Sequence, residues 1–201
     1  YYSDRIVQLP FAMIGLAVGT VLMSSISNAI SNNNMRSVYI QQNSSMRRSM
    51  MLILPCVVGL VVLAEPIIKF LFEYGAWTSA STKAVAYAIM IQALVLPAML
   101  ISQIYNKTLY ATQDVKTPVK TSMASLSVAA ILYIALFPLV GYLAIPIGIV
   151  ISGYLKNYLL AHACKKRNLI QHDKRTTLAI IMFGVWAIIL GIGLAKVNIT
   201  N

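Results

Sequence analysis

The chain alternates between long apolar segments and short polar or basic stretches. A membrane-spanning helix needs about 20 predominantly apolar residues, and six segments approach that length. Because their apolarity is continuous rather than alternating, they predict helices and exclude the strands of a transmembrane barrel. The six expected spans cover approximately residues 6–26, 50–72, 84–111, 118–139, 142–163 and 177–197.

Polar and helix-breaking residues separate these segments. The polar run Ser31–Asn34 follows the first span, and Thr117 and Pro118 predict the N-cap and first residue of the fourth. Pro138 and Gly141 predict a very short turn, so the fourth and fifth spans should form an antiparallel hairpin. The predicted fold class is all-α, a polytopic transmembrane bundle of about six helices in a single domain.

Composition agrees with a protein whose lateral surface faces lipid. Hydrophobic residues make up 59% of the chain and charged residues 10%, whereas soluble domains have about 45–50% and about 25%. The net charge of +11 would also suit nucleic-acid binding. However, the basic residues form short clusters between apolar segments, and no recognition helix or Arg-rich arm is visible. We therefore expect membrane lipids, and not nucleic acid, as a partner.

The distribution of Lys and Arg predicts an orientation. Cytoplasmic loops of membrane proteins carry an excess of basic residues, which here follow the first, third and fifth spans. The chain would then enter from the outer side and end on the outer side after six spans. The basic residues of these three regions are Arg36, Arg47, Arg48, Lys107, Lys116, Lys120, Lys165, Lys166, Arg167, Lys174 and Arg175.

Charged residues at the start of the first span are candidates for a binding site. Asp4 and Arg5 lie where an apolar helix begins, and charges at such a position face either the bundle interior or the interfacial water. A guanidinium binds phosphate oxygens through two donors. Gln8, one turn further, would add a donor on a nearby face. Position alone leaves both interpretations open.

A second charged pattern lies at the end of the second span. Glu65, Lys69 and Glu73 are spaced by four residues and predict one acidic–basic–acidic stripe on a helix. Its simplest interpretation is a self-neutralising surface stripe, and a coupling role for Glu65 is the alternative.

Motifs of catalysis are not found in the sequence. It contains no P-loop, zinc-protease, nucleophile-elbow or dinucleotide-binding pattern, and only five acidic residues. We therefore expect no enzymatic activity, no metal site and no cofactor.

Three stretches carry a family resemblance. The first is Tyr1–Pro10 followed by Gly15–Leu22, the second is Glu65–Thr78 and the third is Leu109–Lys120. In order and spacing they resemble the MurJ (MviN) family of bacterial lipid II flippases, within the MOP exporter superfamily. The resemblance extends over essentially the whole chain.

The resemblance implies a position within a larger protein. Members of the family have fourteen spans with both termini in the cytoplasm, and this sequence would begin at the eighth span, which enters from the periplasm. The charge distribution predicts the same orientation. The chain would supply part of the second lobe, with the N-terminal lobe of the same protein as its partner.

The resemblance also implies a function. Such flippases move lipid II, the undecaprenyl-pyrophosphate-linked muropeptide, across the bacterial inner membrane by alternating access. An essential arginine of the family falls on Arg5 and its acidic neighbour on Asp4, so Arg5, Asp4 and Gln8 are the expected substrate-binding residues.

Two alternatives remain at this stage. Another MOP exporter, for O-antigen precursors or drugs, would share the fold, but a drug exporter has no need of a pyrophosphate-binding arginine at Arg5. A non-transporting membrane fragment is the alternative from a different class. An N-terminal lobe with arginines in its first two spans would support the flippase.

Overall fold

Helices account for nearly all of the chain that the computed structural model describes, which is residues 2–74 and 78–171. Strands do not occur within these two ranges, so the predicted all-α class is confirmed. The elements are α1 (Tyr2–Ser31), α2 (Met35–Val62), α3 (Ala64–Phe72), α4 (Ser79–Ala93), α5 (Leu96–Ala111), α6 (Lys116–Val140), the 3-10 turn η1 (Gly141–Leu143) and α7 (Ala144–Lys166).

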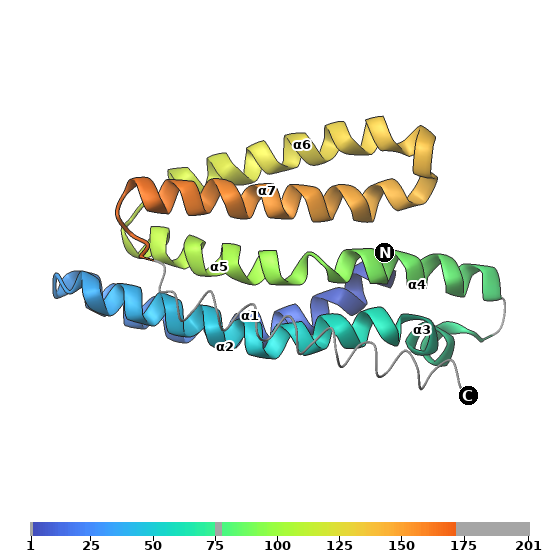
Figure 1. Cartoon of the computed structure of the whole chain (residues 1–201), viewed down its shortest axis with the longest axis horizontal. Helices are drawn as coiled ribbons and strands as arrows, with labels where there is room; N and C mark the ends of the chain where they lie inside the picture. The colour runs from blue at the N-terminus through green and yellow to red at the C-terminus, as the bar shows by residue number, and fades with distance from the viewer. Residues whose placement is uncertain (1, 75–77, 172–201) are drawn as a thin grey trace.

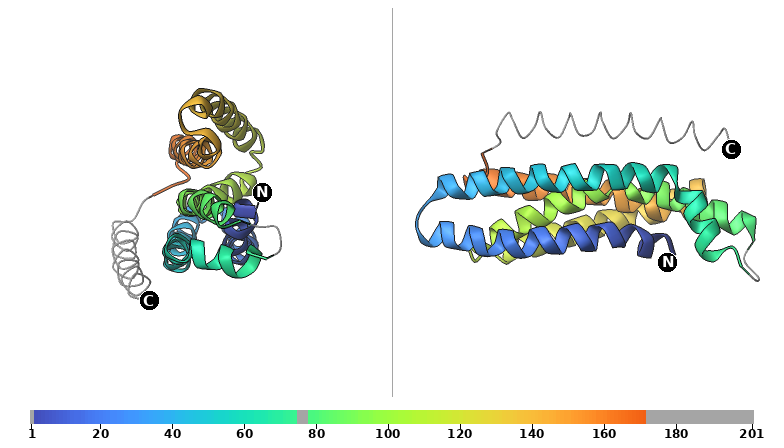
Figure 2. Two further views of the ribbon diagram at one scale, coloured as in Figure 1. Left: turned by 90° about the vertical axis from the view of Figure 1, so that its right-hand side faces the viewer. Right: turned by 90° about the horizontal axis from the view of Figure 1, so that it is seen from below.

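The long helices run side by side in an elongated bundle (Figure 1). Helices α4 and α5 follow one another through its middle, with α1 and α2 on one side and α7 on the other. Helix α6 is outermost and packs mainly against α7, as the end-on view in Figure 2 also shows. This order places α5 between α1 and α7, where the candidate sites lie.

Helices α1 and α2 are longer than the expected spans. Helix α1 has 30 residues, or about 45 Å at the usual rise. Residues 35–49, for which the hydropathy pattern predicts a loop, form the first half of α2. Their buried positions Val38, Gln42 and Met46 recur every fourth residue, so they form an amphipathic helix that is too polar for a membrane span. Asn34 caps this helix by accepting a hydrogen bond from the Ser37 amide at 3.0 Å.

Two of the expected spans are interrupted. The second breaks at Leu63, beyond which the short helix α3 begins. The third breaks at Leu94 and Val95, where the axes of α4 and α5 differ by 42°. Pro97 lies in the first turn of α5 and cannot donate a backbone hydrogen bond across the break. The Leu94 carbonyl at the break accepts a hydrogen bond from the Tyr154 hydroxyl of α7 at 3.0 Å.

Helices α6 and α7 form the predicted antiparallel hairpin (Figure 1). Gly141 turns the chain with a φ of +57°, a value that glycine adopts without a steric penalty. The two helices approach closely, because a Cβ on Gly148 would collide with the ring of Tyr133. The Ser125 hydroxyl also donates to the Ser152 carbonyl at 2.8 Å.

The start of α6 differs from the expectation. The helix begins at Lys116, before the predicted cap Thr117. Instead, Asp114 Oδ1 accepts a hydrogen bond from the Thr117 amide at 3.2 Å. Asp114 also forms an ion pair with Arg167, just beyond α7. The Asp114 carboxylate, and not the predicted Thr117 hydroxyl, therefore bonds the start of α6, and it also links this start to the end of α7.

The helices have the length and apolarity of membrane spans. Three helical segments qualify by length and composition, or four if the bent α4–α5 pair counts as one span. One of the three, Lys116–Lys166, contains the α6–α7 hairpin and would therefore cross twice. Large apolar side chains are exposed along α1 and α6, including Met13, Ile134 and Leu139 at 78–79%. The sixth expected span, 177–197, lies outside the described residues.

Candidate functional site

A carboxylate–amide cluster links the first turns of α1 to α4. Gln8 Nε2 donates to Asp4 Oδ2 at 2.6 Å, and Gln92 Nε2 of α4 donates to Asp4 Oδ1 at 3.1 Å. Gln92 is buried, with 5% of its surface exposed. Since both carboxylate oxygens accept a donor, the cluster fixes the orientation of the Asp4 side chain. A cavity of about 70 Å³ lies beside these three side chains.

Arg5 lies on a different side of α1 from Asp4. Neighbouring residues are rotated by about 100° around a helix axis, and Arg5 is exposed whereas Asp4 is half-buried. The expected site residues therefore separate into an exposed arginine, Arg5, and a hydrogen-bonded pair, Asp4 and Gln8. Asp4 and Gln8 bond each other, and the Gln8 amide nitrogen that was expected to face an anion is used by Asp4.

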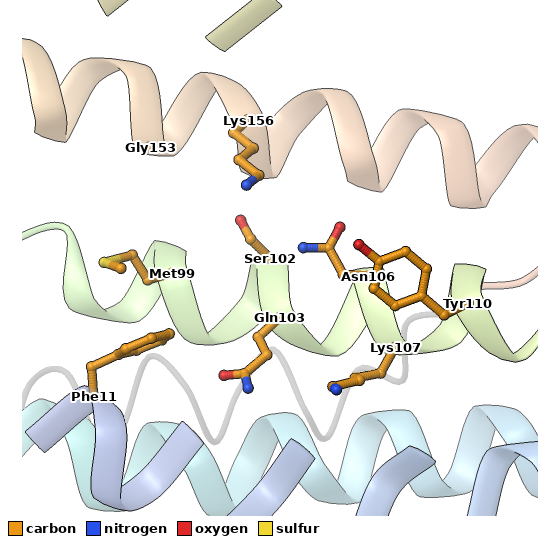
Figure 3. Close-up of a pocket in the computed structure, with 9 residues that line it drawn as sticks. All are labelled: Phe11, Met99, Ser102, Gln103, Asn106, Lys107, Tyr110, Gly153 and Lys156. Carbon is orange, nitrogen blue, oxygen red and sulfur yellow. The ribbon is translucent and has the colours of Figure 1, made fainter. Parts of the chain in front are cut away.

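A larger cavity of about 340 Å³ lies between α1, α5 and α7 (Figure 3). Its polar lining comes mostly from α5, with one lysine from α7. It adjoins the smaller cavity, since both are lined by Phe11 and Met99. The polar lining residues are Ser102, Gln103, Asn106, Lys107, Tyr110 and Lys156.

The α5 residues of this cavity form one helical stripe. Positions 102, 103, 106, 107 and 110 follow the three- and four-residue spacing that places side chains on one face. This pattern is present in the sequence, where Gln103 and Asn106 stand out as polar residues in an apolar segment. The contribution of Lys156 from α7 has no such local signal, because it depends on which helix packs opposite.

Two glycines of α1 admit the polar side chains of α5. Gln103 Nε2 donates to the Gly15 carbonyl at 3.0 Å, and a Cβ on Gly15 would lie 2.6 Å from Gln103 Oε1. A Cβ on Gly19 would lie 2.9 Å from Gln103 Nε2 and 3.4 Å from Lys107 Cε. The small residues therefore allow α5 to bring an amide and a lysine stem against the α1 backbone.

The expected stripe of Glu65, Lys69 and Glu73 does not lie on a single helix. Glu65 and Lys69 are exposed on α3, and Glu73 lies after its end. Thr82 Oγ1 of α4 donates to Glu73 Oε2 at 3.2 Å. Within the two described ranges, no group of three or more His, Cys, Asp or Glu residues could hold a metal ion.

These features define a class of protein. Several helices are long and apolar enough to cross a membrane, and they enclose polar cavities at the faces of α1 and α5. The chain is therefore a polytopic α-helical membrane protein with polar groups inside its bundle, which is the construction expected of a transporter.

Comparison with known families narrows this class. The family model described as lipid II flippase MurJ matches residues 1–200, so the chain belongs to the MurJ family of lipid II flippases. A protein of Rhizobium meliloti named "Probable lipid II flippase MurJ" is 33% identical over 159 residues, which are 79% of this chain and 30% of that protein. The Burkholderia cenocepacia protein named lipid II flippase MurJ is 29% identical and covers 85% of this chain and 33% of its own length.

The fold agrees with that family. A solved structure of lipid II flippase MurJ in an inward closed conformation superposes with a TM-score of 0.74 at 21% identity. The match covers 100% of this chain and 47% of that structure. The chain spans about a third of the length of the curated relatives that it matches.

Proposed function

We propose that this chain forms part of the second lobe of a lipid II flippase, which carries the lipid-linked peptidoglycan precursor across the bacterial inner membrane by alternating access. The family assignment supports this proposal. The observation that carries it is the arrangement of Arg5 and Asp4 at the start of α1. Arg5 is exposed, and Asp4 accepts hydrogen bonds from Gln8 of α1 and Gln92 of α4.

In this proposal Arg5 binds the pyrophosphate of the substrate. A guanidinium stays charged in a low-dielectric cavity and offers two parallel donors to phosphate oxygens. Asp4 and Gln8 contribute through the first turns of α1: the Asp4 carboxylate ties this part of the helix to Gln92, so the position of Arg5 is fixed from the buried side. The N-terminal lobe supplies the opposite wall of the cavity, and no covalent chemistry takes place.

The basic residues support a cytoplasmic location for one end of the bundle. The connections before α2 and α6, and the residues after α7, lie at the same end (Figure 1). Arg36, Lys116 and Lys165 lie next to these three connections. The positive-inside rule then orients this end toward the cytoplasm, and the opening turns of α1 toward the periplasm.

Complementation of a flippase-depleted strain tests the proposal. Arg5→Ala in the complete protein should abolish growth. Arg5→Lys should restore it only partly, because an ammonium lacks the planar pair of donors. Lys120→Ala, on the exposed surface of α6, is the matched control and should grow normally. Normal growth with Arg5→Ala at native expression would overturn the assignment of Arg5.

A further inference from the structure

Residues with buried polar atoms that lack a hydrogen-bond partner line the cavity between α1, α5 and α7. The Ser102 residue is only 5% exposed, and its hydroxyl is buried without a hydrogen-bond partner among the described residues. Asn106 Oδ1 and Gln103 Oε1 are in the same state. Buried hydroxyl and amide groups are nearly always paired with protein, water or ligand. The Ser102 hydroxyl can donate to an occupant of the cavity, whereas the two amide oxygens only accept and need a donor, such as water or a lysine ammonium.

Two lysines give the cavity its charge. Lys156 extends from α7 toward Ser102 and Asn106, and Lys107 extends from α5 toward α1 (Figure 3). Both are half-buried, and neither has an ion-pair or hydrogen-bond partner in residues 2–74 or 78–171. Among the described residues that line this cavity there is no Asp or Glu, and Asp4, beside the adjoining cavity, accepts from two amides.

Water alone fits this lining poorly. Waters would satisfy the hydroxyl and amide groups, but two ammonium groups inside a membrane bundle call for a compensating negative charge. An anion would supply that charge, and its oxygens would be acceptors for the Ser102 hydroxyl, Asn106 Nδ2 and the Tyr110 hydroxyl, which line the same cavity. Lysines together with hydroxyl and amide donors are the groups with which proteins bind phosphate.

We propose that the cavity lined by Lys107, Lys156 and Ser102 is a binding site for a phosphate-bearing anion. Its volume of about 340 Å³ lies within the range of small-ligand sites and accommodates either a free phosphate or pyrophosphate ion or the head group of a phospholipid. The site is separate from Arg5, which does not line it, and its occupancy goes beyond the proposed transport function.

Binding to the complete purified protein tests this site without relying on transport. In one arm, protein in phosphatidylcholine nanodiscs is titrated with inorganic pyrophosphate by calorimetry. In the other, native mass spectrometry counts phosphatidylglycerol molecules retained by detergent-purified protein. Lys107→Gln and Lys156→Gln should each weaken the binding at least about tenfold, as expected for a lost charged hydrogen bond. Lys156→Arg should retain most of it, and Lys120→Gln should leave it unchanged.

Each outcome is decisive. Lysine-dependent binding in the pyrophosphate arm identifies a free anion, and lysine-dependent binding only in the lipid arm identifies a head group. Binding in neither arm overturns the site, as does binding that Arg5→Ala removes and the lysine variants retain. If the Lys→Gln variants do not fold, lysine acetylation of the unmodified protein gives the answer: the bound anion should protect Lys107 and Lys156 but not Lys120. Equal labelling with and without the anion also overturns the proposal.

Discussion

Asp4 on α1 and Gln92 on α4 are joined by a hydrogen bond of 3.1 Å between Oδ1 and Nε2, across 88 positions of sequence. This bond is the polar link between the helix that carries Arg5 and the middle of the bundle. Because Gln92 is 5% exposed, its amide has little access to any other partner.

Replacing Gln92 should therefore weaken the bundle and displace the start of α1. Gln92→Leu leaves Asp4 Oδ1 without its donor and should lower the free energy of unfolding by about 1–3 kcal/mol. Thermal unfolding of the complete protein in detergent measures this loss. Gln171→Leu, on an exposed side chain, is the control and should change stability by less than about 0.5 kcal/mol. Equal effects of the two substitutions would contradict a structural role for the Asp4–Gln92 bond.

The break between α4 and α5 should depend on a hydroxyl from α7. Tyr154→Phe removes the donor to the Leu94 carbonyl, and hydrogen bonds between membrane helices contribute about 0.6 to 2 kcal/mol. We expect a loss of that size in unfolding experiments. Tyr158→Phe, one turn further along α7 and 68% exposed, should have no effect. A Tyr154→Phe variant as stable as the unmodified protein would show that the break is satisfied in another way.

Gly153 should tolerate no side chain. A Cβ at this position would collide with Val95 Cγ2, and Val95 is itself 2% exposed and rigid at χ1. Gly153→Ala should cost about 1–3 kcal/mol as an overpacking change, and a second substitution, Val95→Ala, should recover part of it. Gly59→Ala is the matched control, because nothing lies within 4 Å of a Cβ there and alanine favours the helix. A neutral Gly153→Ala would show that α7 can move away from the break.

Asp114 should give the bundle an acid-sensitive contact outside the membrane. Hydrogen bonds from Thr117, first from its side chain and then from its backbone amide, and the charge of Arg167 lower the pKa of Asp114 below its usual 3.8 and outweigh partial burial. A carboxyl whose folded pKa is lowered stabilises the fold above the unfolded pKa, and the contribution disappears as pH falls through the folded value.

The expected size is modest. Arg167 is 45% exposed, so solvent screens the ion pair and we expect at most about 1 kcal/mol. Melting temperatures of the unmodified protein should fall as the pH drops below the unfolded-state pKa of about 3.9. Asp114→Asn should lower stability at pH 7 and flatten this acid limb. An unchanged acid limb in Asp114→Asn would assign the pH dependence to other carboxylates.

Local features of the fold were accessible from the sequence. The Pro138–Gly141 turn and the hairpin that it forms are encoded by neighbouring residues, and the apolar lengths predicted the helices around them. The break at Leu94 was not predicted, because a membrane helix accommodates Pro97 either as a kink or as an interruption, and the outcome here involves Tyr154, 60 residues away. The first half of α2 was missed because its apolar positions are periodic but sparse.

In the candidate sites, too, local features could be predicted from the sequence and contacts between distant residues could not. Family motifs and position indicated Asp4, Arg5 and Gln8, and their binding role stays a prediction. The separation of a half-buried, hydrogen-bonded Asp4 from an exposed Arg5 required knowledge of α4, because Gln92 supplies the donor that holds Asp4. The second cavity combines a stripe visible along α5 with Lys156 of α7, and only the packing of the two helices brings these groups together.

The short η1 turn between α6 and α7 has a consequence for biogenesis. Three residues, Gly141–Leu143, separate two helices of 25 and 23 residues. A connection of this length is too short for one helix to span the bilayer while the other remains outside it. We therefore expect the pair to enter the membrane as one unit, within which the Ser125–Ser152 hydrogen bond can form. In the folded bundle this hairpin places Tyr154 against the α4–α5 break and Lys156 beside α5, so we expect the cavity between α1, α5 and α7 to be complete only once the hairpin has docked.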